Sequence, residues 1–415
     1  MRPSVSLVVS TAAVWLVSAL TSSAASAQDS RRSQVRPGID VLLSERPALL
    51  RGKRVGLITN PAGVDAKLKP TADLLARAEG VRLVRLMAPE HGIRGDVPAG
   101  DSVADAVDPI TGVPVASIYG KTRRPTPEML ADLDVVVFDL QDVGSRTYTF
   151  VSTLGETMIA CAAAKKPLVV LDRPNPLGGL LMEGPVRREE FFNFICWGPV
   201  PVVHGMTAGE LARLYAGEMK IACDLTVVPV QGLTRRMLWR DTGLDWTMTS
   251  PHIPRELQAY LYVATLMIGG IAKNVSDGVG TTLPFELLAA EWIDGPALAR
   301  ALEAERLAGV RFRALSVQPF YGKFKGKVLH GVQLLLDDPG IHRPLRTALT
   351  LLTTLEKLHP GRIEFEDERV VGVHWGRADV AGLVKAKRSA AEIEAMFAAD
   401  LADFALRRKP YLLYP

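Results

Sequence analysis

The sequence predicts an α/β protein, with a parallel sheet covered by helices on both faces and a second, smaller α/β domain after it. The first observation is a set of short apolar runs, at residues 54–60, 81–87, 135–140 and 167–172, that alternate with helical patterns. Strands that are apolar throughout are typical of parallel sheets buried on both sides. The second observation is that each run ends in a polar cluster. The carboxyl ends of such strands meet at one edge, where ligands bind in these folds.

The elements between these strands follow from the spacing of apolar residues. This spacing predicts helices at 72–78, 127–133 and 149–164 and a short strand at 113–119. Thr207 and Glu210 have the spacing of a capping box, so a helix is expected to begin there and Glu210 to serve as a capping residue.

The second domain is expected where the strand-like pattern fades, beyond Val230. Its features are, in order, an apolar segment at 257–270, a glycine-rich loop at 276–281, a helix at 295–307, strands near 310–316 and 328–336, and helices at 344–358 and 389–406. We therefore predict a Rossmann-like domain at 38–235 and a smaller α/β domain at 236–415.

The N-terminus has the pattern of a secretory signal peptide. Arg2 precedes an apolar run from Val5 to Leu20, and Ala25-Ser26-Ala27 supplies small residues before Gln28. A membrane anchor is the alternative, although Ser and Thr interrupt the run and no later segment reaches the roughly 20 apolar residues of a membrane helix. We expect a signal peptide at 1–27, a flexible leader at 28–37, and an exported protein that is periplasmic or extracellular and free of the membrane.

Composition narrows the class of protein further. The chain has 415 residues, of which 48% are hydrophobic and 23% charged, as in ordinary soluble globular proteins. Its net charge of +4 and the lack of a basic run do not indicate nucleic-acid binding. The cysteines at 161, 196 and 223 fit no zinc pattern, and sequence leaves open whether two of them pair. The oligomeric state cannot be inferred from these features.

Several cofactor and catalytic motifs are missing. No Gly-x-Gly-x-x-Gly follows the first strand, and the chain has neither a Gly-x-Ser-x-Gly elbow nor a His-Glu-x-x-His motif. Tyr119-Gly-Lys-Thr122 lacks the first glycine of a P-loop, because position 115 is a valine. We therefore predict no cofactor. His91, Asp142 and His204 are a conceivable metal-ligand set, but their spacing is not diagnostic, so no metal is predicted.

The catalytic candidates are Glu90, Asp142 and Asp139. Glu90 lies in Pro89-Glu-His-Gly-Ile-Arg-Gly95, directly after a buried strand, where a carboxylate can perform acid or base chemistry. The alternatives are a solvated turn at Glu90 and a turn anchored by Asp139. The candidate substrate-binding residues come from the polar clusters at the strand ends and from the segment before the capping box. They are Asn60, His91, Arg94, Gln141, Arg146, Tyr148, Asp172, Arg173, Asn175 and His204.

Taken together, these segments resemble the bacterial exo-β-N-acetylmuramidase family, long catalogued as a domain of unknown function. The similar segments are Gly38-Ile-Asp40-Val-Leu, Gly56-Leu-Ile-Thr-Asn60-Pro61, Pro89-Glu-His-Gly-Ile-Arg94-Gly, Asp139-Leu-Gln-Asp142-Val-Gly-Ser-Arg146-Thr-Tyr148-Thr, Asp172-Arg-Pro-Asn175-Pro, Glu183-Gly-Pro and His204-Gly-Met-Thr207. The similarity extends from about residue 38 to the closing Tyr411-Leu-Leu-Tyr414-Pro415.

The resemblance implies a Rossmann-like domain and a smaller α/β domain with the cleft between them. It also implies release of N-acetylmuramic acid from the non-reducing ends of peptidoglycan fragments, with Glu90 as the favoured catalytic residue. Glycoside hydrolysis usually needs a second carboxylate, for which Asp142 or Asp139 is the candidate. Muramic acid carries a lactyl carboxylate, so we expect a cationic clamp formed by Arg146, Arg94 or Arg173.

The second half departs from the family pattern. Gly269-Gly270-Ile271 stands where the family has Glu-Gly-Thr, and Gly278-Val279-Gly280-Thr281-Thr282 stands where it has Gly-Arg-Gly-Thr-Asp. A Glu, an Arg and an Asp are thus missing. The leading prediction is an exo-acting muramidase of peptidoglycan-derived saccharides. The alternatives are a catalytically weak muropeptide-binding protein and a metal-dependent hydrolase.

Overall fold

The structure is a computed structural model that describes residues 35–95, 97, 101 and 105–415. The signal peptide predicted at 1–27 and most of the leader lie outside these residues. Within the part that is described, no helix is long and apolar enough to cross a membrane.

The N-terminal part is built on a seven-stranded sheet in the order β3 (Ala106–Val107), β4 (Pro114–Ser117), β2 (Arg82–Ala88), β1 (Arg54–Thr59), β5 (Val135–Asp139), β6 (Leu168–Leu171) and β7 (Leu225–Val228). Every neighbouring pair is parallel except β3 and β4. The mostly parallel sheet confirms the predicted fold class. Two strands were not predicted: β3, which has only two residues, and the edge strand β7, where three of the four residues are only partly buried.

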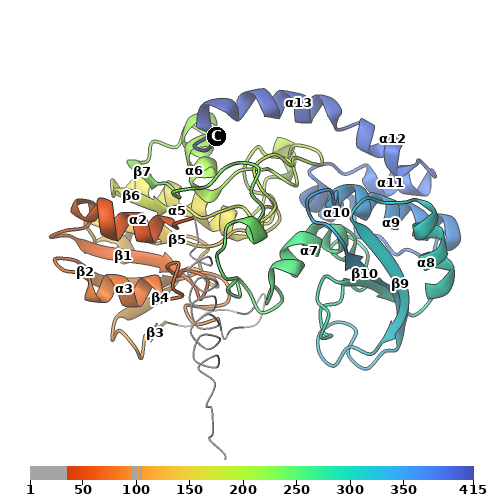
Figure 1. The fold of residues 1–415 in the computed structure, drawn as a ribbon, viewed down its shortest axis with the longest axis horizontal. Coiled ribbons are helices and arrows are strands. Elements are labelled where there is room, and N and C mark those ends of the chain that lie inside the picture. Colours follow the sequence, from red (N-terminus) through yellow and green to blue (C-terminus); the bar gives the residue numbers. More distant parts are fainter. Residues whose placement is uncertain (1–34, 96, 98–100, 102–104) are drawn as a thin grey trace, which may run out of the picture.

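Helices cover both faces of this sheet (Figure 1). One face is covered by α2 (Gly38–Glu45) and α3 (Thr71–Arg77), and the other by α4 (Pro127–Leu130), α5 (Phe150–Ala164) and α6 (Ala208–Glu218). Along β5, Val135 and Val137 pack in the first of these cores, whereas Val136 and Phe138 pack in the second. This two-sided burial explains why the strand is apolar from Val135 to Phe138.

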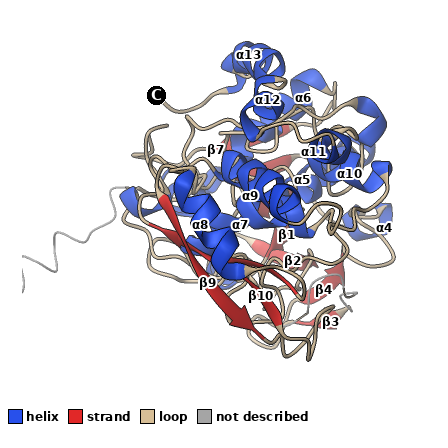
Figure 2. Ribbon diagram, turned by 90° about the vertical axis from the view of Figure 1, so that its right-hand side faces the viewer, coloured by secondary structure: helices blue, strands red, loops and turns tan. Residues whose placement is uncertain are grey.

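The second part contains a small antiparallel sheet in the order β8 (Leu287–Ala290), β10 (Leu329–Leu336) and β9 (Val310–Val317). Helix α8 (Gly295–Ala304) packs on β9 and β10, and α9 (Pro344–Leu358) packs on α8 and on α7 (Glu256–Gly269) (Figure 2). The short helices α10 (Glu368–Trp375) and α11 (Val380–Lys385) follow. The predicted helix at 389–406 is divided into α12 (Ala390–Ala395) and α13 (Ala398–Arg407), with Phe397 fully buried at the break.

The end of the chain returns to the N-terminal part, as Figure 1 shows for α13. Helix η4 (Lys409–Tyr411) packs on α6, and the Leu413 amide donates to Glu210 at 2.8 Å. The Tyr414 hydroxyl donates to Asp172 at the end of β6. These last residues, which belong to the predicted second domain at 236–415, therefore pack against the first domain.

His342, in the turn before α9, is expected to make the protein less stable in acid. The side chain is buried, and neither ring nitrogen has a hydrogen-bond partner among the described residues. Burial alone lowers the pKa of His342 from 6.5 to about 4, so between these pH values the unfolded chain binds a proton that the folded chain does not. Stability contributed by neutral His342 is present above pH 6.5 and falls by about 3 kcal/mol as the pH drops to 4.

Urea denaturation of the protein and of His342→Leu between pH 7 and 4 would measure this effect. The variant is expected to lose less stability over this range than the parent. His330→Leu, at an exposed histidine, serves as the control and should keep the parent's pH dependence. Identical curves for the parent and His342→Leu would contradict the prediction.

Candidate active site

The polar clusters predicted from the sequence lie along one edge of the sheet. Strands β2, β1, β5 and β6 are adjacent and parallel, so their carboxyl ends are neighbours. In the sheet, β2 lies on one side of β1, and β5, which comes later in the chain, lies on the other side. The edge between β1 and β5 is therefore a topological switch point, where open α/β sheets bind their ligands.

Glu90 lies at the tip of a tight turn that follows β2. His91 and Gly92 have φ angles of 72° and 77°, in the left-handed region that few residues other than glycine adopt. The His91 ring is hydrogen-bonded through Nδ1 to the Val97 carbonyl at 3.0 Å. A non-glycine residue in this conformation is the kind of strain that is found at functional sites. The turn leaves Glu90 half-buried at the sheet edge.

Two hydroxyl groups hold the Glu90 carboxylate. The Tyr119 hydroxyl donates to Oε1 at 2.8 Å, and the Thr149 hydroxyl donates to Oε2 at 2.6 Å. Tyr119 follows β4, and Thr149 precedes α5. Burial and the Glu90 charge raise the pKa of Tyr119 to about 12, so its hydroxyl remains a donor at neutral pH. The sequence analysis missed Tyr119, although its place after a strand of the same sheet was a usable signal.

Asp142 and His204 form a buried pair on the other side of the switch point. Asp142 Oδ2 accepts from the Gly144 amide at 2.7 Å and contacts His204 Nε2 at 3.2 Å. The Met206 amide donates to His204 Nδ1, which leaves the proton on Nε2 to be donated to Asp142. Asp142 is 6% exposed, and its Oδ1 has no hydrogen-bond partner among the described residues. One carboxylate oxygen is thus fixed and the other is unengaged.

Tyr148 lies close to both carboxylates. Burial raises the pKa of Tyr148, and the charges of Asp142 and Glu90 raise it further. The Tyr148 hydroxyl donates to Thr249 Oγ1 at 2.8 Å, and the Asn60 amide donates to the Thr249 carbonyl at 2.9 Å. Tyr148 and Asn60 therefore attach the segment that leads into α7 to the edge of the sheet.

Asp139 and Arg173 form a buried ion pair. Arg173 Nη2 donates to Asp139 Oδ2 at 2.9 Å, and Arg173 Nε donates to Oδ1. The Thr71 hydroxyl donates to the same carboxylate, and Arg173 also donates to the Val64 carbonyl. Asp139 is 0% exposed. Neither a catalytic role for Asp139 nor a clamp role for Arg173 agrees with this arrangement, because each neutralises the other away from solvent.

Arg94 and Arg146, the other two arginines expected to bind the lactyl carboxylate, also have partners within the protein. Arg94 is paired with Asp108 at 2.8 Å and with Asp73 at 3.4 Å. Arg146 is 0% exposed and donates to the carbonyl groups of Pro185, Val200 and His374. Because His374 belongs to α10, Arg146 links the two parts of the molecule and cannot reach a ligand in this conformation.

The remaining candidates hold backbone in place. Asp172 accepts from the Thr207 hydroxyl, the Tyr414 hydroxyl and the Gly209 amide at the start of α6, and burial raises the pKa of Asp172 to about 6. The predicted capping box of Thr207 and Glu210 is confirmed.

Asn175 and Gln141 also bind backbone groups. The Asn175 side-chain oxygen accepts from the Leu177 amide, and its side-chain nitrogen donates to the Met206 carbonyl. Gln141 donates to the Pro174 carbonyl, and its Oε1 has no partner among the described residues.

The described residues hold no group of three or more potential metal ligands. Of the conceivable set His91, Asp142 and His204, the last two are paired, whereas the His91 ring is bonded to Val97. All three cysteines are unpaired thiols. Cys161 and Cys196 are buried, as expected for Cys161.

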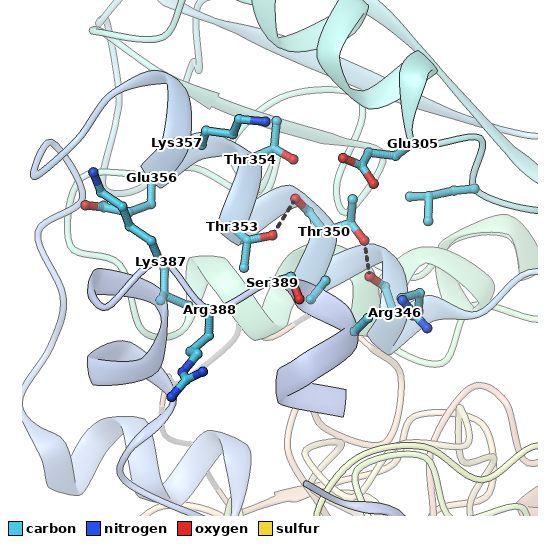
Figure 3. A pocket seen from close by; sticks show the side chains of 14 residues that line it. Glu305, Arg346, Thr350, Thr353, Thr354, Glu356, Lys357, Lys387, Arg388 and Ser389 are labelled. Atoms are coloured by element: carbon cyan, nitrogen blue, oxygen red, sulfur yellow. Dashed lines mark hydrogen bonds between the residues drawn. The ribbon is translucent and has the colours of Figure 1, made fainter. Parts of the chain in front are cut away.

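A pocket of about 220 Å³ opens at the end of β1 and is lined by Asn60, Ile93 and Arg94, among others. A second cavity, of about 490 Å³, lies wholly within residues 305–391. Figure 3 shows its threonines on α9 facing Ser389 and Glu305. None of the candidate residues lines this second cavity, so it is separate from the carboxylates at the sheet edge.

The second half places a carboxylate beside one of the positions that depart from the family pattern. Asp277 packs against Gly269, where an added Cβ would lie 2.8 Å from its Oδ2. Burial raises the pKa of Tyr262, and the charges of Glu90 and Asp277 raise it further. Asp277 therefore occupies the space beside the position at which the expected family Glu is missing.

Two carboxylates, Glu90 and Asp142, beside the switch point of a Rossmann-like sheet are the groups that a glycoside hydrolase uses. The sequence models of the family described as exo-β-N-acetylmuramidase NamZ match this chain twice, the N-terminal domain at residues 55–257 and the C-terminal domain at 260–414. The chain belongs to this family.

Individual relatives agree with this assignment. The peptidoglycan β-N-acetylmuramidase NamZ of Bacillus subtilis (strain 168) is 41% identical over 391 residues, which cover 93% of each chain. A DUF1343 family protein of Bacteroides fragilis has a crystal structure with a TM-score of 0.86 and 39% identity, covering 92% of this chain and all of its own. A second protein of that family and organism has a TM-score of 0.75 and 29% identity, with 92% and 99% covered.

Proposed function

We propose that the protein is an exo-acting β-N-acetylmuramidase that removes terminal, non-reducing N-acetylmuramic acid from peptidoglycan fragments. The observation that carries the proposal is the placement of Glu90, which is half-buried at the switch point of the sheet and held by the hydroxyl groups of Tyr119 and Thr149. Membership of the family and the activity of the Bacillus subtilis relative support the same reaction.

In the proposed reaction, the carboxylic acid form of Glu90 donates its proton to the glycosidic oxygen as the bond to carbon 1 of the sugar breaks, and the resulting carboxylate is stabilised by the hydroxyl groups of Tyr119 and Thr149. Asp142 is the second carboxylate. Its Oδ2 is fixed by Gly144 and His204, while its Oδ1 is buried and has no partner among the described residues. In the proposal, Oδ1 accepts a proton from the water that enters with the sugar and attacks it. Water and the two carboxylates balance the reaction, so no cofactor enters the proposal.

The proposal is tested with the disaccharide N-acetylmuramyl-β-1,4-N-acetylglucosamine and the purified protein. We expect free N-acetylmuramic acid, detected by mass spectrometry, and equal activity after dialysis against a chelator. Binding without release would instead favour a muropeptide-binding protein, an alternative motivated by the altered Gly269 and Val279 positions. Loss of activity on chelation would favour a metal-dependent hydrolase.

We further propose that residues 1–27 direct export and are removed after Ala27. The protein recovered from a cell-envelope or culture fraction is then expected to begin at Gln28, as N-terminal sequencing would reveal. A variant with Ala27→Lys replaces the small residue before the cut and should remain unprocessed. An unprocessed parent protein in the cytoplasm would contradict the proposal.

A further inference from the structure

The proposed substrate requires a cation that the expected residues do not supply. N-acetylmuramic acid differs from N-acetylglucosamine by a lactyl group on carbon 3, which bears a carboxylate. Arg94 and Arg173 are neutralised by aspartates, and Arg146 is fully buried. The cation that binds this carboxylate must lie near Glu90, be exposed, and not be paired with an acid.

Arg123 has these properties. It lies in the loop between β4 and α4 and is exposed. Its guanidinium carbon is 4.4 Å from the ring centre of Tyr119 and 4.7 Å from that of Phe194. Among the described residues no carboxylate forms an ion pair with it, whereas its neighbour Arg124 is paired with Glu156 at 2.6 Å. Two aromatic rings thus hold the charge of Arg123 without neutralising it.

Arg123 is also next to the reacting centre. The ring that it covers belongs to Tyr119, whose hydroxyl donates to Glu90 at 2.8 Å. After burial, the charge of Glu90 raises the pKa of Tyr119 and the charge of Arg123 lowers it, so both charges act on the same hydroxyl. One side chain therefore separates the guanidinium from the proposed acid.

We propose that Arg123 binds the lactyl carboxylate of the N-acetylmuramic acid residue whose glycosidic bond Glu90 protonates. Carbon 3 and carbon 1 belong to the same sugar ring, so one ring can extend from Glu90 to the guanidinium. The planar guanidinium presents a fork of N–H donors that matches a carboxylate, and the two aromatic contacts limit its movement before substrate binds. The inference rests on the proposed function and explains how the site would distinguish muramic acid from N-acetylglucosamine.

The test compares two substrates, 4-nitrophenyl β-N-acetylmuramide and its lactyl methyl ester, in which a neutral ester replaces the negatively charged carboxylate. The parent protein should prefer the acid. Arg123→Gln should lower kcat/KM for the acid by about 10- to 100-fold, the size of a lost charge-assisted contact, mainly through KM. Its kcat/KM for the ester should remain near that of the parent, so the preference for the acid disappears.

Lys121→Gln is the matched control, because it removes the same charge from an exposed residue of the same loop. It should retain the parent's preference, and Arg123→Lys should retain part of it. An equal loss on both substrates in Arg123→Gln would overturn the inference, because Arg123 would then only position Tyr119. An unchanged preference would overturn it as well. A parent protein that hydrolyses neither substrate would instead contradict the proposed function.

Discussion

Glu90→Gln is expected to abolish release of N-acetylmuramic acid while leaving the fold intact. The amide has nearly the same shape as the carboxyl group, and its oxygen can still accept from one of the two hydroxyl groups that hold Glu90. It cannot donate a proton to the leaving oxygen. Loss of a general acid lowers the rate of glycoside cleavage by about 10²- to 10⁴-fold. Rates of release from the disaccharide, with circular dichroism to check folding, measure this change.

The matched control for this prediction is Glu79→Gln. Glu79 is an exposed glutamate beyond α3, on the same domain but away from the sheet edge that holds Glu90. Its rate should equal that of the parent. If Glu90→Gln retained a rate within a few-fold of the parent, Glu90 would not be the acid.

Arg173→Met is expected to lower the free energy of unfolding by about 3–5 kcal/mol, because it leaves the charge of Asp139 buried without its partner. Asp139 is fully covered and would keep only the Thr71 hydroxyl among its side-chain donors. Urea denaturation at pH 7 measures the loss. The double variant Arg173→Met, Asp139→Leu removes both charges and should recover part of the stability.

Arg54→Met provides the comparison for the buried pair. Arg54 forms an ion pair with Asp134 at 2.8 Å, but both side chains are well exposed, so water screens the charges. Its stability should be close to that of the parent. Equal, small losses in Arg54→Met and Arg173→Met would contradict the idea that burial makes the Asp139–Arg173 pair important.

The strands of the main sheet were predictable, and the reason is burial. β1, β5 and β6 lie between two layers of helices, so most of their residues are apolar and each run is visible in the sequence. The short helices α10 and α11 and the break at Phe397 were not predictable, because tertiary contacts determine them. Nothing in the local sequence pattern of residues 408–415 indicates that they pack against the first domain.

The position of the site in the fold was predictable from the sequence, but the pairing of its charged side chains was not. The rule that parallel strands end at one edge brought Glu90, Asp142 and Asp172 to the same part of the fold. Which charges cancel depends on distances between side chains. Arg173 is paired with Asp139, 34 positions earlier, whereas Arg123 is held by aromatic rings and remains unpaired among the described residues. No spacing in the sequence distinguishes these two arginines.

The contacts of the last residues have a consequence for how the protein folds during its synthesis. Tyr414 donates to Asp172 across 242 positions, and Leu413 donates to Glu210 across 203. The buried carboxylates of Asp172 and Glu210 therefore lack these two hydrogen-bond donors until residues 413 and 414 have been synthesised. Such long-range contacts make folding slow. The first domain therefore acquires its last contacts only after the whole second domain has been synthesised.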